Sequence, residues 1–336
     1  MASCTSPGGQ GTPSDTTAPT TADTAAPTDT TSPTPTEAPA TGLPTPIVTE
    51  PPASTNLDGI SATGAFGDKP TLTVPFPWVI NSTQTKILVQ GTGSVVPDQG
   101  WVQINYLGMN GRTGEVFDNS YDYGSPVSFP LTGVIPGFQK GLSGKHVGDR
   151  LIIAIPGADG YDSASSQPTG IEIGDTLVFV VDIVNTSYDQ PSGTTVTPSA
   201  DPNLPVVGGT LTAPTVTIPQ GATPPTSLVV QPLIVGPGAK VAATDTVIVN
   251  YVEYLWSNGT QVRTTYGFAP LSGLLSSTIQ GWQTALVNQT AGSRLLLVVP
   301  PSLAYPNGNP KIGVPANSTM VFVIDIVFSY YDTSSS

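Results

Sequence analysis

The sequence predicts an α+β fold that occurs twice, each copy an antiparallel sheet curled around one short helix, after a disordered Thr/Pro-rich stalk. Strand-like and helix-like patterns alternate within residues 101–156, which predicts a small sheet with one helix. The same pattern returns about 145 residues later, which indicates a duplication. Residues 5–55 are mostly Thr, Pro, Ala, Ser and Gly, without an aromatic residue. Such a segment buries too little apolar surface to offset the entropy lost on ordering.

The first copy opens with a half-buried strand and contains one helix. Val102, Ile104 and Tyr106 alternate with polar residues, as in a strand with one buried face. The segment VIPGFQKGL allows its proline in the first helical turn and places Phe138 and Leu142 four apart on one face. Further strands are expected at residues 85–96, 147–156 and 175–186, and a proline-containing edge strand at residues 67–80.

Segments of the first copy are echoed in the second. VQINYLG is echoed by VIVNYVE, IPGFQKGL by IQGWQTAL, and DRLIIAIP by SRLLLVVP. The offset is 145 from Tyr106 to Tyr251 and 143 from Phe179 to Phe322, so the whole unit is repeated. We therefore divide the chain into a stalk (1–56), a first domain (57–187), a linker (188–203), a second domain (204–332) and a tail (333–336).

The composition argues against several classes of function. The chain has 10 Lys and Arg against 23 Asp and Glu, so it offers no basic surface for nucleic acid. One Cys and one His predict no intrachain disulfide, no Cys/His zinc cage and no Ser-His-Asp triad. We expect neither a metal nor a cofactor.

The single cysteine lies near the start of the sequence, in MASCTS. Small residues before Cys4 and a polar tether after it look like the end of a bacterial lipobox. We expect an apolar signal segment upstream in the full gene and a lipid on Cys4, so that the protein is an extracytoplasmic lipoprotein on the outer face of the bacterial cytoplasmic membrane. The alternative is an incidental free cysteine in a disordered tail.

Five sequence blocks of the first copy closely resemble the FKBP-type peptidyl-prolyl cis-trans isomerases. The blocks are VQINYLG, GEVFDNS, VIPGFQKGL, VGDR and the strand LIIAIP, in the order and spacing of that family. The resemblance implies a sheet around one helix and an enzyme that rotates X-Pro bonds without metal or cofactor. It also implies proline-containing peptides and unfolded exported proteins as partners, and macrolides as possible inhibitors.

Rotation about an X-Pro amide makes and breaks no covalent bond, although its barrier is about 18–20 kcal/mol. The twisted amide loses its resonance dipole, so a dry apolar pocket favours it over the planar amide. The sequence should therefore supply an aromatic cup with few polar groups. By resemblance, the first copy supplies Tyr106, Phe117, Asp118, Val134, Ile135, Phe138, Tyr161 and Phe179.

The resemblance also assigns roles and shows departures. The backbone N–H of Ile135 and the hydroxyl of Tyr161 would bind the peptide. Phe138 takes the position of the family's pocket-floor Trp, and Phe129 is expected in the core or at the rim. DGYD replaces the usual YAYG, and the loop after it offers Ile171 where the family has IPP.

The second copy retains part of this set. The matching positions are Tyr251, Ile279, Trp282, Tyr305 and Phe322. The Phe-Asp pair is replaced by Val262 and Arg263, which should open the pocket and reverse its local charge. We expect a weak isomerase, or a peptide-binding or structural module. Reversion of Val262 to Phe and of Arg263 to Asp should restore part of the rate.

The preferred interpretation is a prolyl isomerase of exported proteins that acts mainly through the first copy. Two alternatives remain open. One is a non-catalytic extracytoplasmic peptide-binding or chaperone module with the same fold. The other is a surface protein of immunoglobulin-like β repeats, against which the recurring helix-like segments PGFQKGL and IQGWQTAL argue.

Overall fold

The computed structural model describes residues 51–199 and 201–331. Cys4, the tail 333–336 and all of the expected stalk except residues 51–56 lie outside the described residues. In the part that is described, the first backbone bridge joins Ser54 to Ile80. No helix of residues 51–199 and 201–331 has the length and apolar character needed to cross a bilayer.

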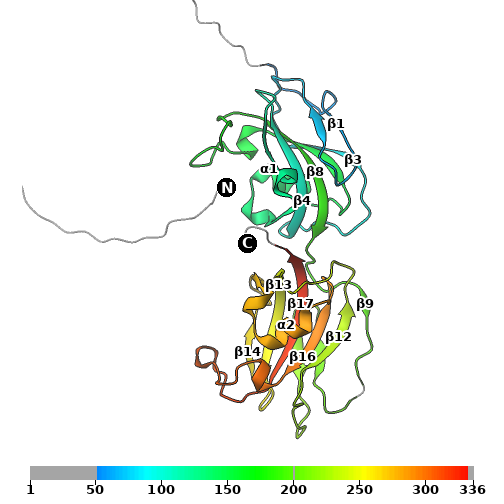
Figure 1. The fold of residues 1–336 in the computed structure, drawn as a ribbon, viewed down its shortest axis with the longest axis vertical. Helices are drawn as coiled ribbons and strands as arrows, with labels where there is room; N and C mark the ends of the chain where they lie inside the picture. Colours follow the sequence, from blue (N-terminus) through cyan, green and yellow to red (C-terminus); the bar gives the residue numbers. More distant parts are fainter. Residues whose placement is uncertain (1–50, 200, 332–336) are drawn as a thin grey trace, which may run out of the picture. The chain divides into compact units, whose positions relative to one another are not determined.

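The first domain contains one antiparallel sheet (Figure 1). Its strand order is β3-β7-β8-β4-β5, and β6 also pairs with β4. The long central strands β4 and β8 have buried apolar residues on both faces, which places them in the middle of the domain. The strands are β3 (Gln84–Val89), β4 (Trp101–Asn110), β5 (Val116–Asn119), β6 (Val127–Pro130), β7 (Arg150–Ile155) and β8 (Leu177–Thr186).

The second domain repeats this sheet with one added strand. Its order is β14-β13-β17-β16-β12-β9, with β15 paired to β13. Tyr106 lies opposite Val181 in the first sheet, and Tyr251 lies opposite Ile324 in the second, so the central registers correspond. The strands are β9 (Thr194–Thr195), β12 (Val229–Val235), β13 (Thr246–Leu255), β14 (Gln261–Thr264), β15 (Leu271–Leu274), β16 (Arg294–Val299) and β17 (Met320–Tyr330).

One short α-helix packs against the inner face of each sheet: α1 (Pro136–Leu142) in the first and α2 (Gln280–Leu286) in the second. The predicted helix is confirmed, with its proline in the first turn. A Cβ atom on Gly137 would lie only 2.2 Å from Ile155 Cγ2, so glycine permits the close approach of α1 to β7. The 3₁₀ helices are η1 (Ser120–Tyr123), η2 (Leu131–Gly133), η3 (Gly157–Asp159), η4 (Leu275–Ser277), η5 (Pro301–Leu303) and η6 (Pro310–Ile312).

The outer face of each sheet is covered by a short β-ribbon. In the first domain, β1 (Ser61–Thr63) pairs with β2 (Thr71–Thr73), and in the second, β10 (Val206–Gly209) pairs with β11 (Pro214–Thr217). Apolar residues of and around each ribbon form a second core with the outward side chains of the sheet. The sheets are therefore buried on both faces.

Two expectations about the chain are wrong in detail. Residues 67–80 do not form an edge strand of the main sheet, because only Thr71–Thr73 is a strand and it pairs with β1. Pro70 and Pro75 limit that strand to three residues, since proline has no N–H to donate. The expected linker 188–203 contains β9, which adds an edge strand to the second sheet.

A buried ion pair ties each ribbon to its sheet. Arg150 on β7 and Asp182 on β8 form a two-pronged pair, with Nε–Oδ1 and Nη2–Oδ2 distances of 2.6 and 2.7 Å. The same guanidinium donates to the ribbon carbonyls of Gly64 and Asp68, at 2.6 and 2.7 Å. In the second domain, Arg294 pairs with Asp325 and donates to the carbonyls of Thr210 and Leu211. In each domain the arginine at this position therefore connects two strands of the sheet to the ribbon.

Removing this guanidinium should destabilise the first domain strongly. Arg150→Ala leaves the carboxylate of Asp182, which is 0% exposed, without its charged partner. Loss of one partner of a buried pair costs about 3–5 kcal/mol. Chemical unfolding of the full chain should therefore show an earlier transition. The control is Lys69→Ala, which removes the exposed partner of Asp122 and should change unfolding far less. Equal effects of the two variants would contradict this assignment.

Candidate functional site

The first domain brings its predicted aromatic residues into one cluster above α1. The ring centroid of Phe138 lies 4.6 Å from that of Phe179 and 6.3 Å from that of Tyr106. Phe117 meets Phe179 edge to face at 5.6 Å, and Phe129 lies 6.2 Å from Phe138. Phe179 is almost fully buried beneath the cluster, whereas Tyr106 and Phe117 are half-buried.

Asp118 is the polar centre of this cup. One carboxylate oxygen accepts the Tyr106 hydroxyl at 2.6 Å, and the other accepts the hydroxyl of Tyr123. Burial, followed by the hydrogen bond to Asp118, raises the pKa of Tyr106, so this hydroxyl is a donor at neutral pH. The hydrogen bond to Asp118 likewise raises the pKa of Tyr123. Tyr123 is not predicted from the sequence, since nothing in the spacing of SYDY shows which tyrosine turns back to the carboxylate.

Val134 and Ile135 lie where η2 ends and α1 begins. Both are partly buried and pack against the inner core of the domain. Ile135 is the residue before the first turn of α1, with φ −56° and ψ 144°, and its carbonyl accepts the N–H groups of Phe138 and Gln139. The backbone at this position is therefore fixed by the helix.

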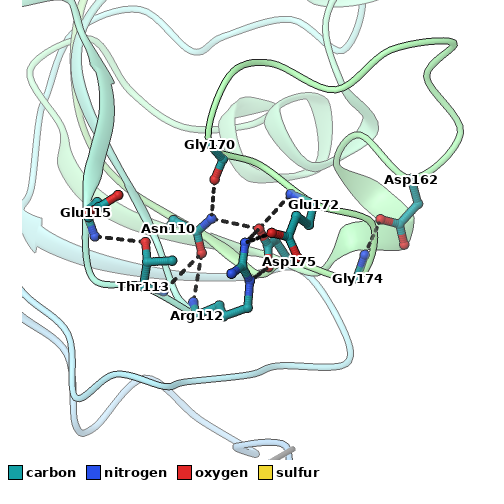
Figure 2. A network of polar contacts seen from close by, with 9 residues as sticks. All are labelled: Asn110, Arg112, Thr113, Glu115, Asp162, Gly170, Glu172, Gly174 and Asp175. Carbon is teal, nitrogen blue, oxygen red and sulfur yellow. Dashed lines mark hydrogen bonds and ion pairs between the residues drawn. The ribbon is translucent and has the colours of Figure 1, made fainter.

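Tyr161 and Ile171 lie on the loop between β7 and β8. Tyr161 packs against the inner core, and its carbonyl accepts Gln167 Nε2 at 3.1 Å. Ile171 is 6% exposed and belongs to the core, so it lies deeper than a rim residue. Gly174 N donates to Asp162 Oδ1 at 2.8 Å, which joins the two ends of the loop (Figure 2).

The base of this loop is held by Asp175 (Figure 2). Its carboxylate accepts Asn110 Nδ2 and Arg112 Nε, both at 2.7 Å, and the Glu172 N–H at 2.8 Å. Asn110 also donates to the carbonyl of Gly170 at 2.9 Å. Burial raises the pKa of Asp175, but these hydrogen bonds outweigh it and the net shift is downward. The turn after β4 thus anchors the loop that carries Tyr161.

The second domain contains an open cavity of about 330 Å³ at the corresponding place. Trp282 lies at 5.1 Å from Tyr251 and at 5.4 Å from Phe322, measured between ring centroids. Tyr251, Ile279, Trp282 and Tyr305 line the cavity together with Arg263. Phe322 is 1% exposed and supports Trp282 from the core.

The residues around Arg263 differ from the first domain as a group. Arg263 Nε donates to Glu253 Oε2 at 2.9 Å, and Nη2 donates to the Tyr305 hydroxyl at 3.1 Å. Glu253 lies opposite Arg263 on paired strands, as Gly108 lies opposite Asp118. Glu253 is not among the residues predicted from the sequence, although the offset of 145 that relates the tyrosines also relates Gly108 to Glu253.

Gly108 explains why residues 108, 117 and 118 of the first domain all differ from their equivalents 253, 262 and 263 in the second domain. A Cβ atom on Gly108 would lie 2.7 Å from both Phe117 Cζ and Phe179 Cε1. The wall ring of Phe117 therefore requires glycine beneath it. In the second domain the smaller Val262 stands at the position of Phe117 and accompanies the Glu253 side chain, whose charge is in turn met by Arg263.

Comparison with known proteins identifies the family. The model of the FKBP-type peptidyl-prolyl cis-trans isomerases matches residues 93–184 and again residues 238–327, which together exceed half of the chain. The chain belongs to this family. It is a tandem FKBP-type isomerase, and both matched regions begin after the ribbons that cover the outer faces.

Several bacterial relatives are similar to this FKBP-type chain. A probable FK506-binding protein of Corynebacterium glutamicum is 34% identical over 119 residues, which are 35% of this chain and 98% of the relative. An FK506-binding protein of Streptomyces anulatus is 36% identical over 30% of this chain and 82% of its own length. The isomerase FkpA of Escherichia coli is 38% identical over 30% of this chain and 36% of its own length.

The expected double reversion needs a third substitution. Val262→Phe with Arg263→Asp would place a ring over Glu253 and a second carboxylate beside one that is 0% exposed. Glu253→Gly with the same two changes removes both conflicts. In full-length chains that also carry Asp118→Ala and Tyr161→Phe, the triple variant should raise prolyl isomerase activity several-fold, and the double variant should not.

The measurement is kcat/KM on one proline-containing peptide in a protease-coupled assay, with thermal unfolding of each variant alongside. A double variant as active and as stable as the triple would show that Glu253 does not control the wall of this pocket.

Proposed function

We propose that the first-domain cup carries the main isomerase activity of this chain. The supporting observation is the aromatic cluster of Tyr106, Phe117, Phe138 and Phe179, with one carboxylate, Asp118, hydrogen-bonded to the Tyr106 hydroxyl. An apolar pocket of this kind favours a twisted amide over the more polar planar amide. A lowering of the barrier by 1.36 kcal/mol already raises the rate about tenfold.

The polar groups of the cup position the peptide. In this proposal the Ile135 N–H, fixed at the start of α1, donates to a peptide carbonyl, and the Tyr161 hydroxyl donates to a second one. Asp118 is held by the hydroxyls of Tyr106 and Tyr123, so its carboxylate keeps one orientation toward the bound chain. No side chain attacks the substrate, and no proton must move.

We further propose that the substrates are unfolded exported proteins and that Cys4 carries a lipid that anchors the chain outside the bacterial cytoplasmic membrane. The proposal rests on the MASCTS segment and on the absence of any other cysteine from the sequence. Mass spectrometry of the protein from its native host should show an acylated Cys4. An unmodified thiol at this position would refute the anchor while leaving the isomerase assignment intact.

Asp118→Ala and Tyr161→Phe should each lower kcat/KM for prolyl peptides, while the domain stays folded. Each removes a hydrogen-bonding group worth about 0.5–1.5 kcal/mol, which corresponds to a loss of roughly 2- to 10-fold. The matched control is Asp122→Ala, because Asp122 lies on the neighbouring η1 and pairs with Lys69 at the surface. EDTA should leave the wild-type rate unchanged. Wild-type turnover in both pocket variants would remove these two residues from the site.

A further inference from the structure

The second-domain cavity differs chemically from the first-domain cup. Its floor is an indole, and its wall carries a guanidinium instead of a carboxylate. Its volume of about 330 Å³ falls within the range typical of small-ligand pockets, roughly 300–1,000 Å³. This space is sufficient for a proline ring with a neighbouring residue.

The ion pair of Arg263 and Glu253 has a fixed orientation relative to the cavity. The Glu253 side chain is 0% exposed and does not line the cavity, whereas the Arg263 side chain is 40% exposed and does. The ion pair therefore presents its positive end to a ligand and keeps its negative end behind the wall. The contacts to Glu253 and Tyr305 use two of the five N–H donors of the guanidinium.

One further group favours a ligand with acceptor oxygens. Burial raises the pKa of Tyr305 to about 12, so its hydroxyl is protonated at neutral pH and stands beside the guanidinium.

We propose that the second-domain cavity binds short peptides in which an apolar residue, such as proline, adjoins a carboxylate. The apolar group packs on Trp282 and Ile279, and the carboxylate pairs with Arg263. The carboxylate can be an acidic side chain or the end of a chain, since both present the same two oxygens. This proposal stands on the second cavity and does not depend on catalysis by the first.

The chain contains a probe specific to this cavity. Among its four tryptophans, Trp282 lines the cavity, and the equivalent position of the first domain is Phe138. The indole N–H resonance of Trp282 can be assigned in the full-length protein by its loss in Trp282→Phe. Titration with acetyl-Ala-Ala-Pro-Glu-amide and with the matching Gln peptide then reports binding at this site alone.

The acidic peptide should shift the Trp282 resonance with an affinity about tenfold higher than that of the Gln peptide, as one charge-assisted hydrogen-bonded pair provides. Because Arg263→Gln alone would leave Glu253 buried without its partner, the test variant is Glu253→Gln with Arg263→Gln. This variant should bind the two peptides equally, with the other three indole resonances in place. The control Lys311→Gln, an exposed charge of the same domain, should keep the preference.

A second pair of peptides separates the two sources of carboxylate. Tighter binding of acetyl-Ala-Ala-Pro as the free acid than as the amide would support the chain end as a ligand, and a preference for the Glu peptide supports the side chain. The proposal is overturned if neither carboxylate strengthens binding to the wild type, or if the preference survives in the Glu253→Gln, Arg263→Gln variant.

Discussion

The pairing of Arg150 with Asp182 is the interaction on which the rest of the first domain depends. It joins the two neighbouring strands β7 and β8, and its guanidinium also donates hydrogen bonds to the carbonyls of the ribbon. Because the ribbon is held in this way, the outer face of the sheet becomes a second core, and β8 is buried on both sides. A strand fixed on its outer face presents its inner residue, Phe179, in a constant position beneath the cup. Arg294 and Asp325 repeat the arrangement in the second domain.

The two domains differ at this site by three residues that depend on one another, and not by the independent loss of single site residues. Gly108, Phe117 and Asp118 form one compatible set, since a Cβ atom on residue 108 would lie only 2.7 Å from the ring of Phe117. The second set is Glu253, Val262 and Arg263, in which a buried acid is balanced by a base and a valine stands at the position of Phe117. Mixing the sets produces either a steric overlap or two adjacent carboxylates. This constraint explains why the second domain keeps a cavity at the corresponding place although a guanidinium, and not a carboxylate, lies beside it.

Much of this architecture could be predicted from the sequence, because long alternating strands and a short helix give strong periodic signals. Trp101–Asn110, Leu177–Thr186 and the helix at Pro136 follow from these patterns. The ribbons could not, since strands of three or four residues bounded by proline and glycine give almost no periodicity. Of the site, the aromatic residues followed from the family's motif. Tyr123 did not, because its contact with Asp118 arises from the geometry of a turn. Glu253 occupies the motif's glycine position in VIVNYVE, but its role became visible only from its pairing with Arg263 across the strands.

The charge of the whole chain places a limit on how the second cavity can select a ligand. With a formal net charge of −13, the long-range field opposes the approach of any acidic peptide. A preference for carboxylates must therefore come from contact with Arg263 and appear mainly in slower dissociation, since the field does not assist encounter. Added salt screens the repulsion between the acidic protein and the acidic peptide, which raises the affinity. Salt also screens the attraction between the exposed Arg263 and the peptide carboxylate, which lowers the affinity, so the two effects oppose each other. A shallow dependence of affinity on salt is thus a consequence of one cation placed locally on an acidic protein, and it distinguishes this cavity from a basic surface that attracts anions at a distance.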